Sequence, residues 1–240
     1  MNTAAATLRD IVGPLVEAIE LDDADRGTVL RGRLPDAAAV ALITRMVESS
    51  EILSACSVIT PGRSDRDELL LPVADMGAAI LTPSPEPRPE PKLSMLHLAK
   101  RKVAGLAVLS GEMLDGMRAA SFMDWLGAAI APAIARDIAS VILMGDTASE
   151  DALLAYQDGV VKLARAGSPS AGPNPDTRIE IESDGLVVRM PQGLVRAAIW
   201  RNVVFDVAPE PKEHASLRIA MEFGFACLDP SLVSVEPAPE

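Results

Sequence analysis

Residues 96–147 read LHLAKRKVAGLAVLSGEMLDGMRAASFMDWLGAAIAPAIARDIASVILMGDT, and this stretch decides the fold. It opens with a basic segment that predicts a strand over Val103–Leu109. Ser110 then begins a Ser-Gly-Glu-Met-Leu-Asp segment, which predicts a short helix with this serine as its N-cap. A long apolar helix follows and ends at Gly145, because glycine is common just beyond a helix C-terminus.

The long helix carries a stripe of large apolar residues at every fourth position. Ser121-Phe-Met-Asp124 matches a capping box at its start. The stripe drifts around the helix, because four residues exceed one turn of ~3.6, so it covers several surfaces. Pro132 predicts a bend near Gly127–Pro132, since an internal proline usually kinks a helix. We expect the stripe to pack in the core; it consists of Phe122, Leu126, Ile130, Ile134, Ile138 and Ile142.

Two further helices are predicted before this stretch. Residues Thr7–Glu20 carry apolar residues at helical spacing, with Pro14 perturbing the middle. Residues Ala37–Ser49 repeat this spacing, and Asp36 is the expected N-cap.

Residues Glu68–Leu109 are predicted to form two long strands joined at a tip. The tip reads TPSPEPRPEPK and holds five prolines between Pro83 and Pro91. Proline fixes φ and lacks the N–H that a ladder needs, so we expect a stiff, extended, solvated segment. On composition alone, this segment is either a protruding arm or a Pro-rich linker between two domains.

The C-terminal part of the chain is predicted to be mostly β. A capping box at Thr147–Glu150 first predicts a helix over Ala152–Ala166. Beyond a Pro- and Gly-rich loop, a Ser-Asp-Gly turn joins two strands in a hairpin. The strand candidates are Arg178–Glu182, Leu186–Met190, Ala197–Val207 and Leu217–Cys227.

Composition limits the classes of function. The chain has 240 residues, is 49% hydrophobic and 23% charged, and has a net charge of −12, so we expect a folded soluble protein that does not bind nucleic acid through a basic patch. The longest apolar run, Trp125–Ala135, is shorter than the ~20 residues that cross a bilayer, and no secretion signal is apparent. Cys56 and Cys227 are expected to be buried small hydrophobes rather than reactive groups.

No catalytic, cofactor-binding or metal site is predicted. His97 and His214 lack a partner at metal-ligand spacing. Ser110 lacks the Gly-x-Ser-x-Gly frame of a nucleophile elbow and is better explained as an N-cap. Aromatic residues make up only 3% of the chain, which disfavours a ligand pocket.

The order of strand, capped short helix, long helix and Gly145-Asp146 ending resembles the tailed-bacteriophage major capsid protein family. The resemblance implies an α+β fold of the Johnson type, with an N-terminal arm, an extended two-stranded E-loop, a P domain with a long spine helix, and a small β-rich remainder. The implied divisions are residues 1–66 (N-terminal helical arm), 67–109 (E-loop and return strand), 110–166 (P-domain spine and following helix), 167–207 (reduced axial-type β region) and 208–240 (C-terminal P-domain strand and tail).

The function implied by this resemblance is structural: a subunit, not an enzyme, that self-assembles into an icosahedral phage or prophage-type shell. The implied partners are further copies, packaged DNA without sequence-specific binding, and portal, scaffold or decoration proteins, without a membrane. The implied location is the virion capsid, assembled in the bacterial cytoplasm. The residues implied to reach a neighbouring subunit through the E-loop are Pro83, Pro85, Pro87, Arg88, Pro89, Pro91 and Lys92.

Two alternatives stay open at this point. An encapsulin-like nanocompartment shares the Johnson fold but encloses protein cargo. A small soluble enzyme or binding module, with Pro83–Pro91 as a linker, belongs to a different class.

Overall fold

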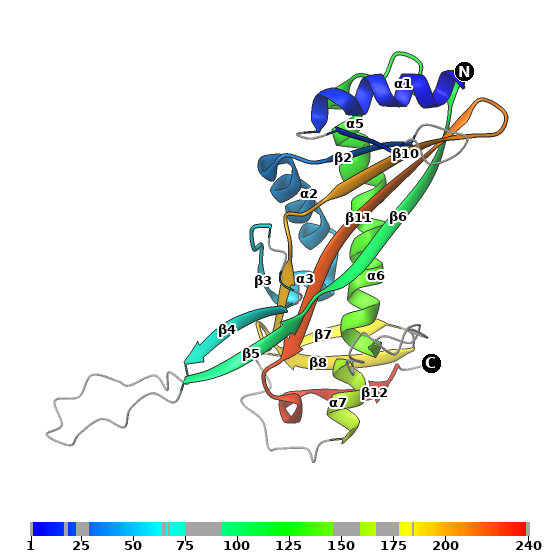
Figure 1. Cartoon of the computed structure of the whole chain (residues 1–240). Helices are drawn as coiled ribbons and strands as arrows, with labels where there is room; N and C mark the ends of the chain where they lie inside the picture. Colours follow the sequence, from blue (N-terminus) through cyan, green and yellow to red (C-terminus); the bar gives the residue numbers. More distant parts are fainter. Residues whose placement is uncertain are drawn as a thin grey trace, which may run out of the picture.

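The computed structural model of the chain describes residues 2–16, 19–22, 29–63, 66, 68–74, 93–145, 159–166, 178–183 and 185–238 (Figure 1). It has a mixed α+β architecture built on a seven-stranded sheet, a three-stranded sheet and a two-stranded hairpin. The strands of the large sheet are β1 (Ile19–Asp22), β2 (Val29–Arg33), β3 (Ser57–Ile59), β6 (Arg101–Ser110), β9 (Val195–Ile199), β10 (Val204–Glu210) and β11 (His214–Cys227).

Strand β11 is the centre of the large sheet. Residues 214–223 of β11 pair antiparallel with β6, while β10 and β9 pair with successive parts of β11. Strand β2 continues the sheet beyond β10, and β3 pairs parallel with β9. Side chains alternate between the two faces of a strand, and the burial of β6 alternates in the same way. One face of the sheet therefore lines the core, and the other is turned outward.

A long helix packs on the large sheet along β6. It runs through α5 (Ala119–Trp125), the π turn η2 (Leu126–Ile130) and α6 (Ala131–Met144), and it ends at Gly145, whose φ is 86°. The predicted helix and its glycine ending are confirmed. The predicted capping box is wrong: α5 begins at Ala119, so Ser121 already lies inside the first turn.

The N-terminal helix differs from its prediction. Helix α1 spans Thr3–Val12 and is followed by a 3-10 turn, η1 (Gly13–Leu15), that contains Pro14. The proline therefore ends the helix rather than bending it, and Ile19 belongs to strand β1. The side chain of Asn2 caps α1 by accepting from the N–H of Ala5. The helix packs on β10, β11, α4 and α5. Five of its residues are buried: Ala4, Ala5, Leu8, Ile11 and Val12.

Two short helices follow strand β2. Helix α2 spans Asp36–Glu48, close to the prediction, but Pro35 occupies the N-cap position and Asp36 is the first helical residue. The expectation that Asp36 caps this helix is therefore wrong, and its carboxylate instead meets two arginines. Helix α3 (Glu51–Ala55) is capped by the side chain of Ser50, which accepts from the N–H of Leu53.

The C-terminal region contributes strands to two different sheets. Strands β7 (Arg178–Ser183) and β8 (Leu186–Pro191) form the predicted hairpin, and β12 (Ser234–Pro237) pairs with β8 beyond the short turn η4 (Pro230–Leu232). In contrast, β9 and β10 replace the single strand predicted over Ala197–Val207, and both belong to the large sheet. Helix α7 is described over Val160–Ala166; residues 146–158, with the predicted capping box, lie outside the described part.

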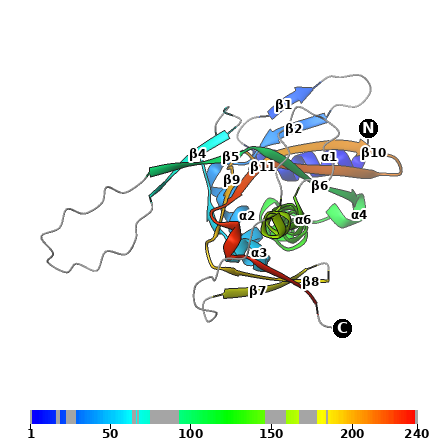
Figure 2. The ribbon, with the colours of Figure 1, turned by 90° about the horizontal axis from the view of Figure 1, so that it is seen from below.

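Figure 2 looks along α6, with the large sheet on one side and the small sheet on the other. The continuous helix Ala119–Met144 has 26 residues and a window of mean hydropathy 1.7, so by length and composition it could cross a membrane. Half of that window is buried inside the protein, where α6 packs on β6 of the large sheet. The sequence predicted no segment long enough to cross a membrane, because only the uninterrupted apolar run Trp125–Ala135 was counted.

Replacing Ile134 by aspartate tests the packing of this helix. Ile134 is 1% exposed, and burying an unpaired carboxylate there costs several kcal/mol against a total stability of ~5–15. We expect Ile134→Asp to abolish soluble expression or lower the melting temperature strongly in circular dichroism. Ser140→Asp is the control, because Ser140 is exposed on the same helix and its change should stay within about 0.5 kcal/mol. Equal melting curves for the two variants would contradict the burial of Ile134 in the core.

Candidate assembly surfaces

The long helix approaches β6 closely at one glycine. A Cβ at Gly105 would lie 3.2 Å from Cγ1 of Ile134 and 3.3 Å from Cγ2 of Ile130. Because Gly105 has no side chain, the helix can pack closely against the strand at this position. All six residues of the predicted apolar stripe are buried: Phe122, Leu126, Ile130, Ile134, Ile138 and Ile142.

The helix passes Pro132 through a widened turn. In η2 the N–H of Ala131 donates to the carbonyl of Leu126, five residues back, instead of four. Such a π turn accommodates the proline ring, which clashes with the carbonyl four residues before it in a regular helix. The sequence predicted an irregularity at Gly127–Pro132, and the structure has it at Leu126–Ile130.

A two-stranded hairpin, β4 (Glu68–Ala74) and β5 (Leu93–Ala99), projects from the body (Figure 1). Its strands pair antiparallel from Glu68 opposite Ala99 to Ala74 opposite Leu93. One face of the hairpin packs at its base on Trp200, which is 1% exposed. The hairpin residues in this small core are Leu69, Leu71, Leu96 and Leu98.

The chain crosses from the hairpin into the sheet at a close contact. Lys100 joins β5 to β6, and its ammonium lies 3.1 Å from the carboxylate of Glu222 and 5.2 Å from the ring centre of Trp200. A Cβ at Gly224 would lie only 2.6 Å from the carbonyl oxygen of Ala99, so only glycine allows the strands to cross here. The side chain of Lys100 is 9% exposed, so its ion pair with Glu222 is shielded from solvent. The direction of the hairpin is thus fixed by contacts within the subunit.

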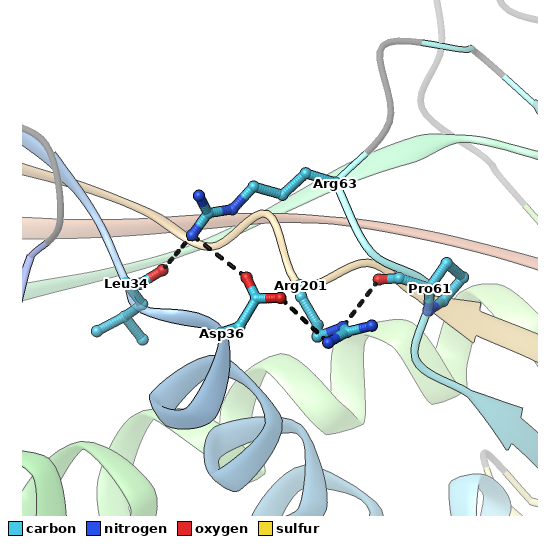
Figure 3. Close-up of polar contacts among 5 residues, drawn as sticks. All are labelled: Leu34, Asp36, Pro61, Arg63 and Arg201. Atoms are coloured by element: carbon cyan, nitrogen blue, oxygen red, sulfur yellow. Dashed lines mark hydrogen bonds and ion pairs between the residues drawn. The ribbon is translucent and has the colours of Figure 1, made fainter.

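A second anchor ties the loop before β4 to the body (Figure 3). Arg63 and Arg201 converge on the carboxylate of Asp36, at 3.3 Å and 3.1 Å. Arg63 also donates to the carbonyl of Leu34 at 3.0 Å, and the backbone N–H of Arg201 donates to the carbonyl of Pro61 at 3.1 Å. One aspartate therefore joins the start of α2, the loop that leads to the hairpin, and the segment between β9 and β10.

These ion pairs order the loop more than they stabilise the fold. The side chains of Asp36, Arg63 and Arg201 are 48%, 34% and 32% exposed, and exposed pairs contribute about 0–1 kcal/mol each. Asp36 also lies in the first turn of α2, where a negative charge is favourable. The sequence does not predict this cluster, because no local pattern marks residues that are 165 positions apart, as Asp36 and Arg201 are.

The residues expected to reach a neighbour through the E-loop lie outside the described residues. They are Pro83, Pro85, Pro87, Arg88, Pro89, Pro91 and Lys92. The hairpin strands that lead to and from this segment are described, and their register is continuous up to Ala74 and Leu93.

The candidate catalytic residues have other roles in the described structure. Ser110 accepts from the N–H of Met113 at 3.3 Å, so its predicted role as the N-cap of α4 (Gly111–Leu114) is confirmed. His97 lies 3.2 Å from Glu68 on the exposed side of the hairpin, and His214 contacts the carbonyl of Lys212 in the β10–β11 turn. Within the described ranges, no three histidine, cysteine or acidic residues gather as metal ligands would.

Both cysteines are shielded thiols. Burial raises the pKa of Cys56 to about 12, with a smaller contribution from Cys227 nearby. Burial likewise raises the pKa of Cys227 to about 11. Since the thiolate is the nucleophile, such thiols are unreactive near neutral pH.

Among the grooves on the described surface, two are open, and neither is lined by histidine or cysteine. A groove of about 530 Å³ lies between α3, α6 and β7, near Ser50, Arg136 and Glu182. A groove of about 420 Å³ lies at the base of the hairpin, near Arg63 and Trp200. Their lining therefore offers no nucleophile paired with a histidine base.

No protein-family model matches this sequence. No curated protein matches it either. Among solved structures, this chain is similar to a chain of the satellite phage P4 procapsid, in a structure that includes the size determination (Sid) protein. The TM-score is 0.51 at 9% identity, and the match covers 82% of this chain and 90% of that chain. A chain from Mycobacterium phage Bobi has a TM-score of 0.49 at 14% identity, and the match covers 97% of this chain and 98% of that chain. At such identities the likeness to the P4 procapsid chain shows the fold alone: this chain has the mixed α+β fold of a phage capsid.

Alanine at Gly224 tests the crossing that orients the hairpin. The new Cβ would meet the Ala99 carbonyl, so the backbone must shift, and such overpacking costs about 1–3 kcal/mol. We expect a lower urea midpoint for Gly224→Ala. Gly111→Ala is the control: the nearest atom to its Cβ position is the carbonyl oxygen of Glu213 at 3.8 Å, an ordinary contact, so this variant should be neutral or more stable by about 0.4–1 kcal/mol. If both variants unfold at the wild-type midpoint, the close crossing is not present in solution.

Proposed function

We propose that this chain is a major capsid protein, a structural subunit that self-assembles into the icosahedral shell of a phage or prophage-type particle. The single observation that carries this proposal is the fold shared with a chain of the P4 procapsid over 82% of this chain. The projecting β4–β5 hairpin supports it, because its face away from Trp200 leaves Leu70 and Met95 exposed, as a surface that a partner covers would be.

Within a Johnson-type fold, the divisions proposed from the sequence are assigned as follows. Residues 67–109 are the E-loop and its return strand, with β4 and β5 as its base. Residues 110–166 hold the spine of the P domain, and residues 208–240 add its C-terminal strand and tail. Residues 1–66 are the N-terminal region, of which α1 stays packed on its own subunit. The reduced axial-type region lies within residues 167–207, and the β7–β8 hairpin is the part of it that lies outside the large sheet.

The net charge of −12 fits a wall that encloses DNA without holding it. Tight binding of a duplex requires clustered lysine and arginine to release counterions, and an acidic wall lets the duplex slide during packaging. The proposed partners are therefore further copies, packaged DNA without sequence preference, and portal, scaffold or decoration proteins. The proposed location is the virion capsid, assembled in the host cytoplasm.

Particle formation is the first test of this function. We expect purified protein to form capsomers or closed particles, seen as large species by size exclusion with light scattering and as shells by negative-stain electron microscopy. Nuclease-resistant nucleic acid inside shells from the native host supports a capsid, whereas protein cargo supports the encapsulin-like alternative. A sharp 25.3 kDa monomer at high concentration, with no particles, contradicts a shell function and favours a soluble enzyme or binding module.

Deleting residues 84–90 tests the inter-subunit role of the E-loop tip. Shortening a loop changes its closure entropy by less than about 1 kcal/mol, so we expect an unchanged melting curve. Particle yield should fall sharply, because the proposed contact with the neighbour is lost. A same-length Gly/Ser replacement of residues 84–90 is the control that separates length from proline stiffness. If the deletion unfolds the protein, the tip belongs to an internal core and the E-loop assignment is wrong.

A further inference from the structure

The turn between β10 and β11 has a strained backbone. It lies between Glu210 and His214, which pair at the ends of the two strands. Within it, Lys212 and Glu213 have φ angles of 61° and 60°, and among the described residues they are the only ones other than glycine with a positive φ. This left-handed conformation is costly for a residue with a Cβ, so glycine or asparagine usually occupies such turn positions. Both residues are exposed, so burial of their side chains does not account for the conformation.

The side chain of Asn2 holds both ends of this turn. Its amide nitrogen donates to the carbonyl of Glu210 at 2.5 Å and to the carbonyl of His214 at 2.8 Å. One amide carries two N–H groups, so a single side chain serves both carbonyls. The N-terminal end of α1 accordingly lies at this end of β10 and β11 (Figure 1).

Three further contacts hold the two strained residues themselves. The N–H of Gly111, at the start of α4, donates to the carbonyl of Glu213 at 3.2 Å. The N–H of Thr3 donates to the carboxylate of Glu213 at 3.2 Å. The ring Nδ1 of His214 lies 2.5 Å from the carbonyl of Lys212. A strained backbone persists only where its surroundings over-determine it, and here the start of α1 supplies much of that restraint.

Helix α1 keeps Asn2 in place. The Oδ1 atom of Asn2 accepts from the N–H of Ala5 at 3.3 Å, so the cap of the helix and the bonds to the turn belong to one side chain. Ala4 and Leu8 are 0% exposed, and the helix packs on β10, β11 and α4. Docking of α1 and closure of the turn are therefore coupled. If the start of the helix lifts, both amide donors leave, while the strain at Lys212 and Glu213 remains.

We propose that α1 is a clasp: Asn2 holds the β10–β11 turn in its left-handed conformation, and the turn relaxes when the start of α1 lifts. The closed state is the one described above. In the open state Lys212 and Glu213 return to negative φ, which changes the exposed surface at this end of the large sheet. This coupling is a property of the single subunit and does not rest on the proposed shell function.

Limited proteolysis with a lysine-specific endoproteinase tests the clasp. A protease needs an extended segment in its active site, so the closed turn should resist cleavage after Lys212. Asn2→Asp keeps the capping oxygen but removes both N–H donors. We expect it to release residues 213–240 about tenfold faster than wild type, because two hydrogen bonds of the closed state are lost. Mass spectrometry separates this product from cleavage at the other lysines: Lys92, Lys100, Lys102 and Lys162.

Two comparisons make the proteolysis specific to the turn. Thr7→Asp adds the same charge to an exposed position of α1, one turn beyond Asn2, and should cleave after Lys212 at the wild-type rate. Cleavage after Lys102, within β6, reports unfolding of the sheet and should stay unchanged in Asn2→Asp. Equal rates after Lys212 in Asn2→Asp and wild type overturn the proposal. An equal rise after Lys102 also overturns it, because the effect is then general unfolding.

A glycine substitution measures the strain even if Asn2→Asp fails to fold. Glycine adopts a positive φ without steric cost, so we expect Lys212→Gly to raise the melting temperature by a few degrees. Asp115→Gly is the control: Asp115 is also an exposed charged residue, but its φ is −63°, so glycine there should lower the melting temperature. If Lys212→Gly lowers the melting temperature as Asp115→Gly does, the turn is unstrained and the clasp is refuted.

Discussion

The contact between the long helix and strand β6 is the constraint on which the rest of this structure depends. At Gly105 the helix settles directly on the strand, and Ile130 and Ile134 fill the space that a side chain would occupy. Because side chains alternate along a strand, this packing also decides which residues of β6 face outward. The same strand continues through Lys100 into the hairpin. The packing of the core, the outward apolar face and the direction of the hairpin are therefore three consequences of one arrangement.

Rigidity at the base of the hairpin matters more than the energy of the individual contacts. The ion pairs around Asp36 are half-exposed and weak, yet they join three segments of the chain at one carboxylate. The crossing at Gly224 and the shielded Lys100–Glu222 pair restrain the other strand of the hairpin. An arm that is already held in one direction loses less conformational entropy when a partner binds it. The contacts at the base therefore restrain both strands of the hairpin within the subunit.

Local signals in the sequence predicted much of the fold, and long-range packing accounts for what they missed. The basic segment around Val103–Leu109 predicted β6, a serine marked the start of α4, and Gly145 marked the end of the long helix. Helix α1 was misplaced because the cap at Asn2 and the turn at Pro14 outweighed the apolar spacing beyond Val12. Strand β9 was not separated from β10, since the break between them is set by pairing with β11. The Asp36 cluster had no local signature, because its three members meet only after the sheet has formed.

The charge of the chain limits which forces hold copies together. At a net charge of −12, two copies repel each other at long range, although salt screens this repulsion beyond about 8 Å at physiological ionic strength. Attraction between copies of the proposed shell subunit must then act at short range, mainly through apolar contact. Contacts of this kind are individually weak, so a copy that docks in a wrong position can dissociate before further contacts secure it. In the proposed shell, long-range repulsion combined with short-range attraction favours ordered assembly over irregular aggregation.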